Sequence, residues 1–214
     1  MREERLDPKR KKECAMRNML LTSNGLSTPE ISGSFREMTG SGRKNVKVLF
    51  IPTASRTEEE LVYVRKTYEE LLASGVMPEY LTVFDIDKCL EDRSCYDPYE
   101  FDCMVVCGGN TYYLLSKLKE SGFLDLIREA VENGVLYVGV SAGSVIASVS
   151  IAHISFLDEN DIGLEDYSAL GFVGEQIVPH YETGFDAQLD PEGSFLCIRD
   201  FTALQVRGNI RATV

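Results

Sequence analysis

The residues best suited to chemistry in this chain lie in three short loops, and the first is Gly139-Val140-Ser141-Ala142-Gly143. It matches G-x-S-x-G between a short apolar run and a helical pattern, where the sharp turn exposes the serine hydroxyl. The start of the following helix offers partial positive charge and free N–H groups to a developing oxyanion. The pattern indicates a catalytic serine, with a merely tight strand-to-helix turn as the alternative.

The second loop is Gly108-Gly109-Asn110-Thr111, which also follows a buried apolar run. Two glycines permit backbone conformations closed to other residues and expose N–H groups to a ligand. Such a loop could complete an oxyanion hole with the amide of Ala142. A glycine-rich turn capped by Asn110 and a phosphate cradle stay open, although neither standard phosphate-loop motif, G-x-x-x-x-G-K-[ST] or G-x-G-x-x-G, occurs.

The third loop, Ile177-Val-Pro-His180-Tyr181, supplies a candidate base. The chain has only 2 histidines, so a histidine partner for Ser141 must be His153 or His180. If the helix after Ser141 continued to His153, about twelve residues at 1.5 Å each would carry that ring roughly 18 Å away. His180 instead closes a strand-like run, where catalytic loops gather, and is the favoured base.

The elements that must position these loops alternate along the chain. Apolar runs predict strands over 19–23, 46–52, 79–84, 101–107 and 135–139, and helical patterns cover 57–75, 111–118, 123–133 and 142–150. Continuous apolar strands belong to sheets covered on both faces. The sequence therefore predicts an α/β fold, a doubly wound and mostly parallel sheet with helices on both faces. Strand-like runs over 171–178, 195–198 and 202–206 predict a late antiparallel addition.

Composition narrows the possible partners. The 214 residues are 44% hydrophobic and 26% charged, which is ordinary for a globular chain. A net charge of −12 argues against nucleic acid or an anionic membrane as the partner. Residues 1–17 hold seven basic and four acidic side chains, and we expect a disordered basic leader there before a single domain over 18–214.

The 6 cysteines include no C-x-x-C pair. Cys103 and Cys107 lie four apart in one apolar run without a second ligand pair, so no metal site is expected from them. We expect reduced and mostly buried thiols. Together with the absence of a secretory signal pattern, this predicts a cytoplasmic protein.

Three motifs together resemble the peptidase E family of aspartyl dipeptidase-like serine peptidases: V-V-C-G-G-N-T-Y-Y-L-L (105–115), G-V-S-A-G-S (139–144) and V-P-H-Y (178–181). The likeness covers about residues 17–214. It implies a fold similar to class I glutamine amidotransferases, with no metal or organic cofactor. It also implies that Ser141 is the nucleophile, His180 the general base, and Gly109 with Ala142 the oxyanion donors; beside them, Asn110 is expected to contact substrate.

The family places an acidic residue downstream of the histidine, in a loop before the last strands, and two positions match: Glu192 and Asp200. Asp200 is favoured because the strand-like run 202–206 follows it. Asp158 and Asp161, in the loop after the Ser141 helix, are lesser candidates.

One departure from the family affects the substrate. Relatives carry a helical insertion after the histidine, with an arginine that grips the substrate's aspartate, whereas residues 181–197 here contain no Lys or Arg. A buried carboxylate needs such a partner, and Arg199 or Arg56 would have to substitute. We therefore expect hydrolysis of small peptides, dipeptidase-like, without a firm Asp-X preference. Hydrolysis of another amide or ester, and a silent ligand-binding relative, are the alternatives; the sequence does not fix the oligomeric state.

Overall fold

The computed structural model describes residues 17–92, 96–182 and 184–214. Its strands are β1 (Asn18–Thr22), β2 (Val48–Ile51), β3 (Leu81–Val83), β4 (Cys103–Val106), β5 (Leu136–Val140), β6 (Gln176–Val178), β7 (Phe195–Cys197), β8 (Ala203–Arg207) and β9 (Ile210–Thr213). Its α-helices are α1 (Pro29–Met38), α2 (Glu58–Ala73), α3 (Ile86–Asp92), α4 (Thr111–Glu120), α5 (Phe123–Glu132) and α6 (Ala142–Val145). Short 3-10 helices are η1 (Pro78–Tyr80), η2 (Pro98–Glu100), η3 (Ala152–Phe156) and η4 (Phe185–Gln188).

The main sheet has the strand order β3-β2-β4-β5-β1-β8-β9. Strands β1 to β5 run parallel to one another, β8 pairs antiparallel with β1, and β9 pairs antiparallel with β8. The predicted fold is confirmed: a mostly parallel sheet with helices and a late antiparallel pair. The late segment differs in one respect, because β6 and β7 pair parallel in a separate two-stranded sheet.

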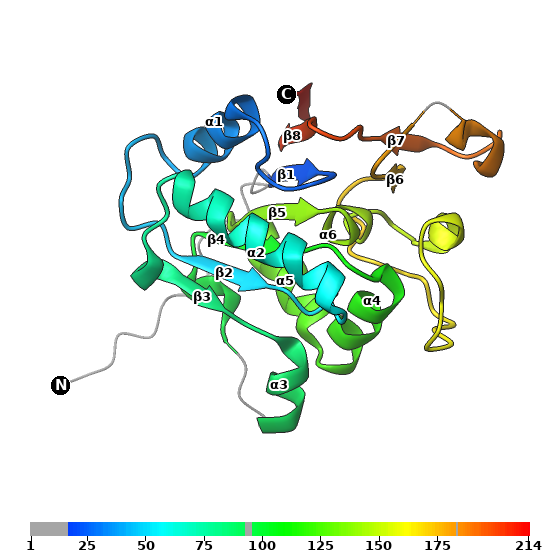
Figure 1. Cartoon of the computed structure of the whole chain (residues 1–214), viewed down its shortest axis with the longest axis horizontal. Coiled ribbons are helices and arrows are strands. Elements are labelled where there is room, and N and C mark those ends of the chain that lie inside the picture. The colour runs from blue at the N-terminus through cyan, green and yellow to red at the C-terminus, as the bar shows by residue number, and fades with distance from the viewer. Residues whose placement is uncertain (1–16, 93–95, 183) are drawn as a thin grey trace.

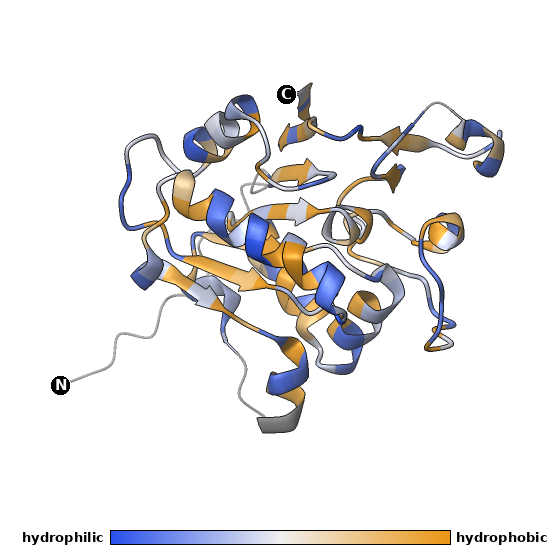
Figure 2. Cartoon of the chain, in the orientation of Figure 1, coloured by the Kyte–Doolittle hydropathy of each residue, from blue (hydrophilic) through white to orange (hydrophobic). Residues whose placement is uncertain are grey.

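Side chains of successive strand residues point to opposite faces of the sheet, and each face has its own core. Leu20, Val48 and Phe50 pack with residues of α1 and α2, whereas Met19 and Leu49 pack with α4, α5 and α6. Figure 1 shows α2 crossing one face of the strands, and Figure 2 shows the strands mostly orange while α2 alternates between orange and blue. This two-sided burial is why the strands read as continuous apolar runs.

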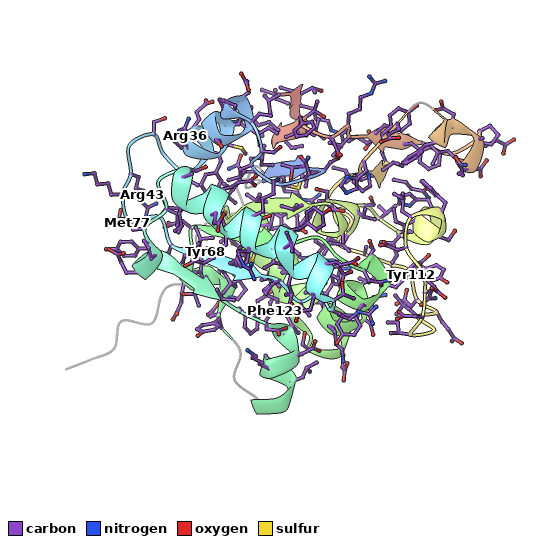
Figure 3. The ribbon with its side chains drawn as sticks, viewed as in Figure 1. Arg36, Arg43, Tyr68, Met77, Tyr112 and Phe123 are labelled. Atoms are coloured by element: carbon purple, nitrogen blue, oxygen red, sulfur yellow. The ribbon has the colours of Figure 1, made fainter. Side chains whose placement is uncertain are left out.

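Large aromatic side chains anchor the helices to both faces. The ring of Tyr68, on α2, meets Phe50 of β2 edge-on with centroids 6.0 Å apart. On the other face Tyr112 of α4 and Phe123 of α5 are almost completely buried. All three helix residues are labelled in Figure 3. They fix the helices on both sides of the strands whose ends carry the loops described above.

The helix after Ser141 is shorter than predicted, since α6 ends at Val145 rather than continuing to residue 150. The carbonyls that would accept the next helical bonds are taken by the returning chain: Leu170 N–H donates to Ile146, and Phe172 N–H to Ala147. β-branched residues over 145–151 also lower the helix propensity. The predicted extension over 146–150 is therefore wrong.

The remaining findings concern the cysteines, the predicted leader and membrane spans. Cys103, Cys107 and Cys197 are free, but Cys89 is disulfide-bonded, so the expectation of reduced thiols is wrong at that position. The predicted basic leader lies outside the described residues except for Arg17. Within the described ranges, no helix is long and apolar enough to cross a membrane.

Candidate active site

Ser141 sits at the carboxyl end of β5, in a turn that only small neighbours allow. A Cβ at Gly139 would lie 2.6 Å from the Gly143 carbonyl oxygen, and a Cβ at Gly143 would lie 2.1 Å from the Val106 carbonyl oxygen. The two glycines therefore let α6 approach β4 and β5 closely. The Ser141 N–H donates to the Thr22 carbonyl of β1 over 2.9 Å, which fixes the turn to the neighbouring strand.

The structure brings Ser141, His180 and Asp200 together in one hydrogen-bonded chain. Ser141 Oγ lies 2.9 Å from His180 Nε2, and His180 Nδ1 lies 2.7 Å from Asp200 Oδ1. A carboxylate accepts from Nδ1–H, so Nε2 is left with the lone pair that can take the serine proton. This is the arrangement by which a serine hydroxyl is activated as a nucleophile.

The backbone is strained at two of these residues, Ser141 and His180, and directly after the third. Among the described residues, the non-glycine positions with positive φ are Ser141 (φ 49°), His180 (φ 53°) and Phe201 (φ 62°), which follows Asp200. Such conformations cost about 1–3 kcal/mol each and persist only where the surrounding structure enforces them. The fold thus holds Ser141, His180 and the neighbour of Asp200 in turns that they would not adopt on their own.

Ser23, which follows β1, was not singled out from the sequence, yet it holds the histidine loop. Its buried hydroxyl accepts the N–H of His180 over 2.9 Å and donates to the Ile198 carbonyl over 2.8 Å. One side chain therefore ties the loop after β6 to the segment that leads to Asp200. Its position at the end of a predicted strand, at the edge where catalytic loops gather, was the available signal.

The Gly108–Gly109 loop is held against the segment after β2. The Ser55 hydroxyl donates to the Gly108 carbonyl over 2.7 Å, and the Asn110 N–H donates to the Ala54 carbonyl over 2.9 Å. Gly109 has φ 130°, and a Cβ there would lie 2.2 Å from the Ala54 carbonyl oxygen, so only glycine fits.

The N–H groups of Gly109 and Ala142 are given no partner by the hydrogen bonds of the described residues. Ala142 is the first residue of α6, where helix geometry leaves the N–H free. A Cβ at Gly108 would touch the Cβ of Ser141 at 3.0 Å, so the glycine loop lies directly beside the serine. These two amides are thus free to receive a ligand oxygen.

Asn110 does not line the pocket that opens over Ser141. Its Oδ1 accepts the N–H of Tyr113 as the N-cap of α4, and its Nδ2 donates to the Glu159 carbonyl. Both ends of the amide are occupied, so the expected contact between Asn110 and substrate is not supported. The capped glycine turn, one of the alternatives from the sequence, describes its role.

The other acidic candidates lie elsewhere. Glu192 is exposed in a turn where its N–H bonds to Asp190, and the structure records no bond between Glu192 and His180. Asp158 accepts the N–H of Thr111 at the start of α4; burial, more than any neighbour, raises the pKa of its carboxyl. Asp161 forms an ion pair with Arg56. Asp200 is therefore the acid that the structure places on the imidazole.

His153 is not the base, although the helix that was expected to carry it away from Ser141 already ends at Val145. It lies in η3, and its Nε2 bonds to the Ile177 carbonyl over 2.7 Å. Burial lowers the pKa of its ring. It is a packed histidine beside the β6 strand, and His180 is the one that reaches Ser141.

A pocket of about 390 Å³ opens over Ser141. Its walls come from the ends of β1, β4 and β5, from Ser55, and from one side of α2. Neither of the arginines considered from the sequence lines it: Arg56 stacks on Tyr113 and pairs with Asp161, and Arg199 lies over the ring of Tyr181. The proposed substitution of a family arginine by either residue is not supported.

Within the described part of the chain, no group of three or more His, Cys, Asp or Glu side chains is placed to hold a metal ion. Cys103 and Cys107 are buried, and burial raises the pKa of both thiols. Among the described residues, the pocket offers the serine, the imidazole, the Asp200 carboxylate, the free amides, and the charged side chains of Glu60 and Lys66.

Comparison with known proteins gives a consistent result. The family model of peptidase family S51 matches residues 19–208. An uncharacterised peptidase of Listeria monocytogenes, Lmo0363, is 37% identical over 168 residues, which is 78% of this chain and 78% of that protein. Peptidase E of Haemophilus influenzae is 30% identical over 142 residues, or 64% of this chain and 59% of that protein.

A crystal structure of a putative peptidase E protein from Listeria monocytogenes superposes with a TM-score of 0.78 at 32% identity, over 94% of this chain and 98% of that one. A peptidase from an acI-B1 actinobacterium shares the fold, with a TM-score of 0.67 at 17% identity over 94% of this chain and 88% of that one. The family match spans the strands and loops that carry Ser141, His180 and Asp200. The chain belongs to peptidase family S51, and it is a serine-type peptidase.

Proposed function

We propose that this peptidase hydrolyses short peptides by acylation of Ser141, with His180 as general base and Asp200 as the acid that orients it. The observation that carries the proposal is the imidazole of His180, which bridges Ser141 Oγ at 2.9 Å and Asp200 Oδ1 at 2.7 Å. A ring held on both sides in this way has one tautomer and one orientation. That is the requirement for a base that must receive a proton and return it.

In the first half-reaction Ser141 Oγ attacks the scissile carbonyl carbon while its proton passes to His180 Nε2. The carbonyl oxygen becomes an oxyanion, and the amides of Gly109 and Ala142 are the donors proposed to stabilise it. One donor of this kind contributes about 3 kcal/mol to the transition state. When the C–N bond breaks, His180 gives its proton to the leaving amine, and an acyl ester remains on Ser141.

In the second half-reaction water replaces the amine. His180 takes a proton from the attacking water, a second oxyanion forms at the same amides, and collapse returns the proton to Ser141 Oγ as the acid product leaves. The carboxylate of Asp200 stabilises the imidazolium that forms on His180. No atom outside the chain, the peptide and water enters the balance.

The size of the pocket favours small substrates. Its volume of about 390 Å³ lies near the lower end of the usual range for small-molecule sites, about 300–1,000 Å³. Relatives named peptidase E support peptidase activity, and the dipeptidase-like preference is proposed from the small pocket. No arginine lines the pocket among the described residues, so a strict Asp-X preference is not proposed. A cytoplasmic location remains part of the proposal.

Ser141→Ala tests the proposal, with hydrolysis of a dipeptide panel and of p-nitrophenyl esters as the assay. We expect loss of both activities with the fold intact by circular dichroism, and Ser41→Ala, an exposed loop serine, should keep full activity. Ester hydrolysis without any amide hydrolysis by the unaltered enzyme would favour the alternative esterase. Full turnover by Ser141→Ala would show that another residue does the chemistry.

A further inference from the structure

Helix α2 presents two opposite charges to the pocket. Glu60, in its first turn, and Lys66, six residues later, both line the cavity that holds Ser141. Apart from His180, Lys66 is the only basic side chain among the lining residues that the structure describes. A pocket with one cation and one anion on the same wall is suited to a ligand that carries both charges.

Lys66 lies at the end of the pocket that holds the imidazole and its carboxylate. Its Nζ donates to the Asn24 carbonyl over 2.7 Å, and the Asn24 side chain accepts the N–H of Phe201, directly after Asp200. Nζ also pairs with Glu70 at 2.9 Å. An ammonium has three protons, so one remains for a ligand while the other two hold the side chain in place.

Glu60 lies at the opposite end, beside the glycine loop. Its Oε2 accepts the N–H groups of Arg56 and Thr57, which closes the capping box of α2. The structure records no hydrogen bond to its Oε1, which is free for a ligand. The same 53–57 segment holds the Gly108 carbonyl through the hydroxyl of Ser55.

The reaction itself orients a peptide between these two charges. His180 must protonate the leaving nitrogen, so the leaving amino acid lies on the side of His180 and Asp200, where Lys66 is. The acyl residue then lies toward Glu60. Six residues of helix span about 9 Å, and the two ends of an extended dipeptide are about 7 Å apart, so both charges can be reached at once.

We propose that Lys66 binds the C-terminal carboxylate of the leaving amino acid and that Glu60 binds the free ammonium of the acyl residue. Building on the proposed function, this makes the substrate class the free, zwitterionic dipeptide, selected by its two ends rather than by its side chains. Longer peptides place their carboxylate beyond Lys66, and blocked peptides lack one of the two charges.

Kinetics with three related substrates test the proposal: Ala-Ala, Ala-Ala-amide and N-acetyl-Ala-Ala. Lys66→Gln should raise KM for Ala-Ala by about 10- to 100-fold, the range for a lost charge-assisted hydrogen bond, and leave the amide unaffected. Glu60→Gln should do the same for the free amine and leave N-acetyl-Ala-Ala unaffected; its glutamine can still close the capping box. Arg65→Gln and Glu59→Gln remove neighbouring exposed charges of α2 and should change neither KM.

Two results would overturn the proposal. One is equal hydrolysis of free and blocked dipeptides by the unaltered enzyme. The other is that Lys66→Gln raises KM for substrates with a side-chain carboxylate instead of those with a C-terminal carboxylate. This would be seen as a higher KM for Asp-Ala-amide than for Ala-Ala-amide in the variant relative to the unaltered enzyme. Calorimetric binding of Ala-Ala to Ser141→Ala, repeated with Lys66→Gln added, separates the two claims. Tight binding that depends on Lys66, without hydrolysis by the unaltered enzyme, would refute the proposed function alone.

Discussion

Ser23→Ala is the perturbation that tests how the fold holds the histidine. The hydroxyl of Ser23 is completely buried and bonds on one side to the N–H of His180 and on the other to the carbonyl of Ile198. Alanine removes both bonds and adds no bulk. The substitution therefore leaves the N–H of His180 without a partner, whereas the Ile198 carbonyl keeps the N–H of Tyr181 at 3.1 Å. It touches no atom of the proposed chemistry.

The magnitude follows from the unpaired N–H of His180. A buried donor left unsatisfied costs about 1–3 kcal/mol, and the free energy of unfolding should fall by about that amount. His180 has φ 53°, a strained conformation worth about 1–3 kcal/mol that the bond to Ser23 helps to hold. Once released, the ring drifts from Ser141, and a displacement of about 1 Å costs about 100-fold in turnover.

Urea unfolding and steady-state hydrolysis of a dipeptide measure the two effects. We expect kcat to fall about 100-fold with little change in KM, because Ser23 positions the base rather than holding the substrate. Ser34→Ala, which removes a buried serine of α1 outside the pocket, is the control and should leave kcat unchanged. A Ser23→Ala variant with unaltered kcat and less than about 1 kcal/mol lost would refute the reasoning.

Three further predictions follow from the geometry. Asp200→Asn should lower kcat by about 10³- to 10⁴-fold in the dipeptide assay, because an amide no longer enforces one imidazole tautomer. Glu192→Gln should leave kcat unchanged. A large loss of kcat in Glu192→Gln and none in Asp200→Asn would make Glu192 the acid. Gly109→Ala should lower turnover at least about 100-fold, because the added Cβ would lie 2.2 Å from a backbone atom. Gly134→Ala is the control: Gly134 has φ 100° and no atom within 4 Å of the added Cβ. This variant should lose only about 1–2 kcal/mol of stability to backbone strain and keep full activity. Burial lowers the pKa of His153, so as the pH falls the unfolded chain takes up a proton there before the folded chain does, and the free energy of unfolding should fall below about pH 6.5. His153→Gln should reduce this pH dependence, measured by urea unfolding between about pH 7.5 and pH 5. An unchanged pH dependence would contradict the burial argument.

Much of the fold and the core of the site could be predicted because both depend on local signals. Buried parallel strands produce apolar runs, and a serine elbow requires small residues at fixed spacing, as Gly139 and Gly143 show. His180 was reachable because only two histidines were available. The choice between Asp200 and Glu192 rested on the order of motifs, and the contact with the imidazole singles out Asp200.

What escaped prediction depends on contacts between distant parts of the chain. Ser23 acts on a backbone group 157 residues away, and no local pattern encodes that bond. The early end of α6 reflects carbonyls taken by the 169–173 segment. A substrate-binding role for Lys66 and Glu60 could be proposed only from the position of α2, which forms one wall of the pocket.

The prediction that Asn110 contacts substrate is not supported, for a different reason. A polar residue beside the glycine loop fits a substrate contact and a helix cap equally well in the sequence. The bonds of its amide to Tyr113 and Glu159 decide for the cap.

The activated state of Ser141 can be measured directly by reaction with an aryl phosphonate, followed by mass mapping of the modified peptide. We predict a single adduct on Ser141 in the unaltered protein, at a rate that falls by orders of magnitude in His180→Ala. An adduct on a different residue, or a Ser141 that reacts no faster with His180 than without it, would contradict the account.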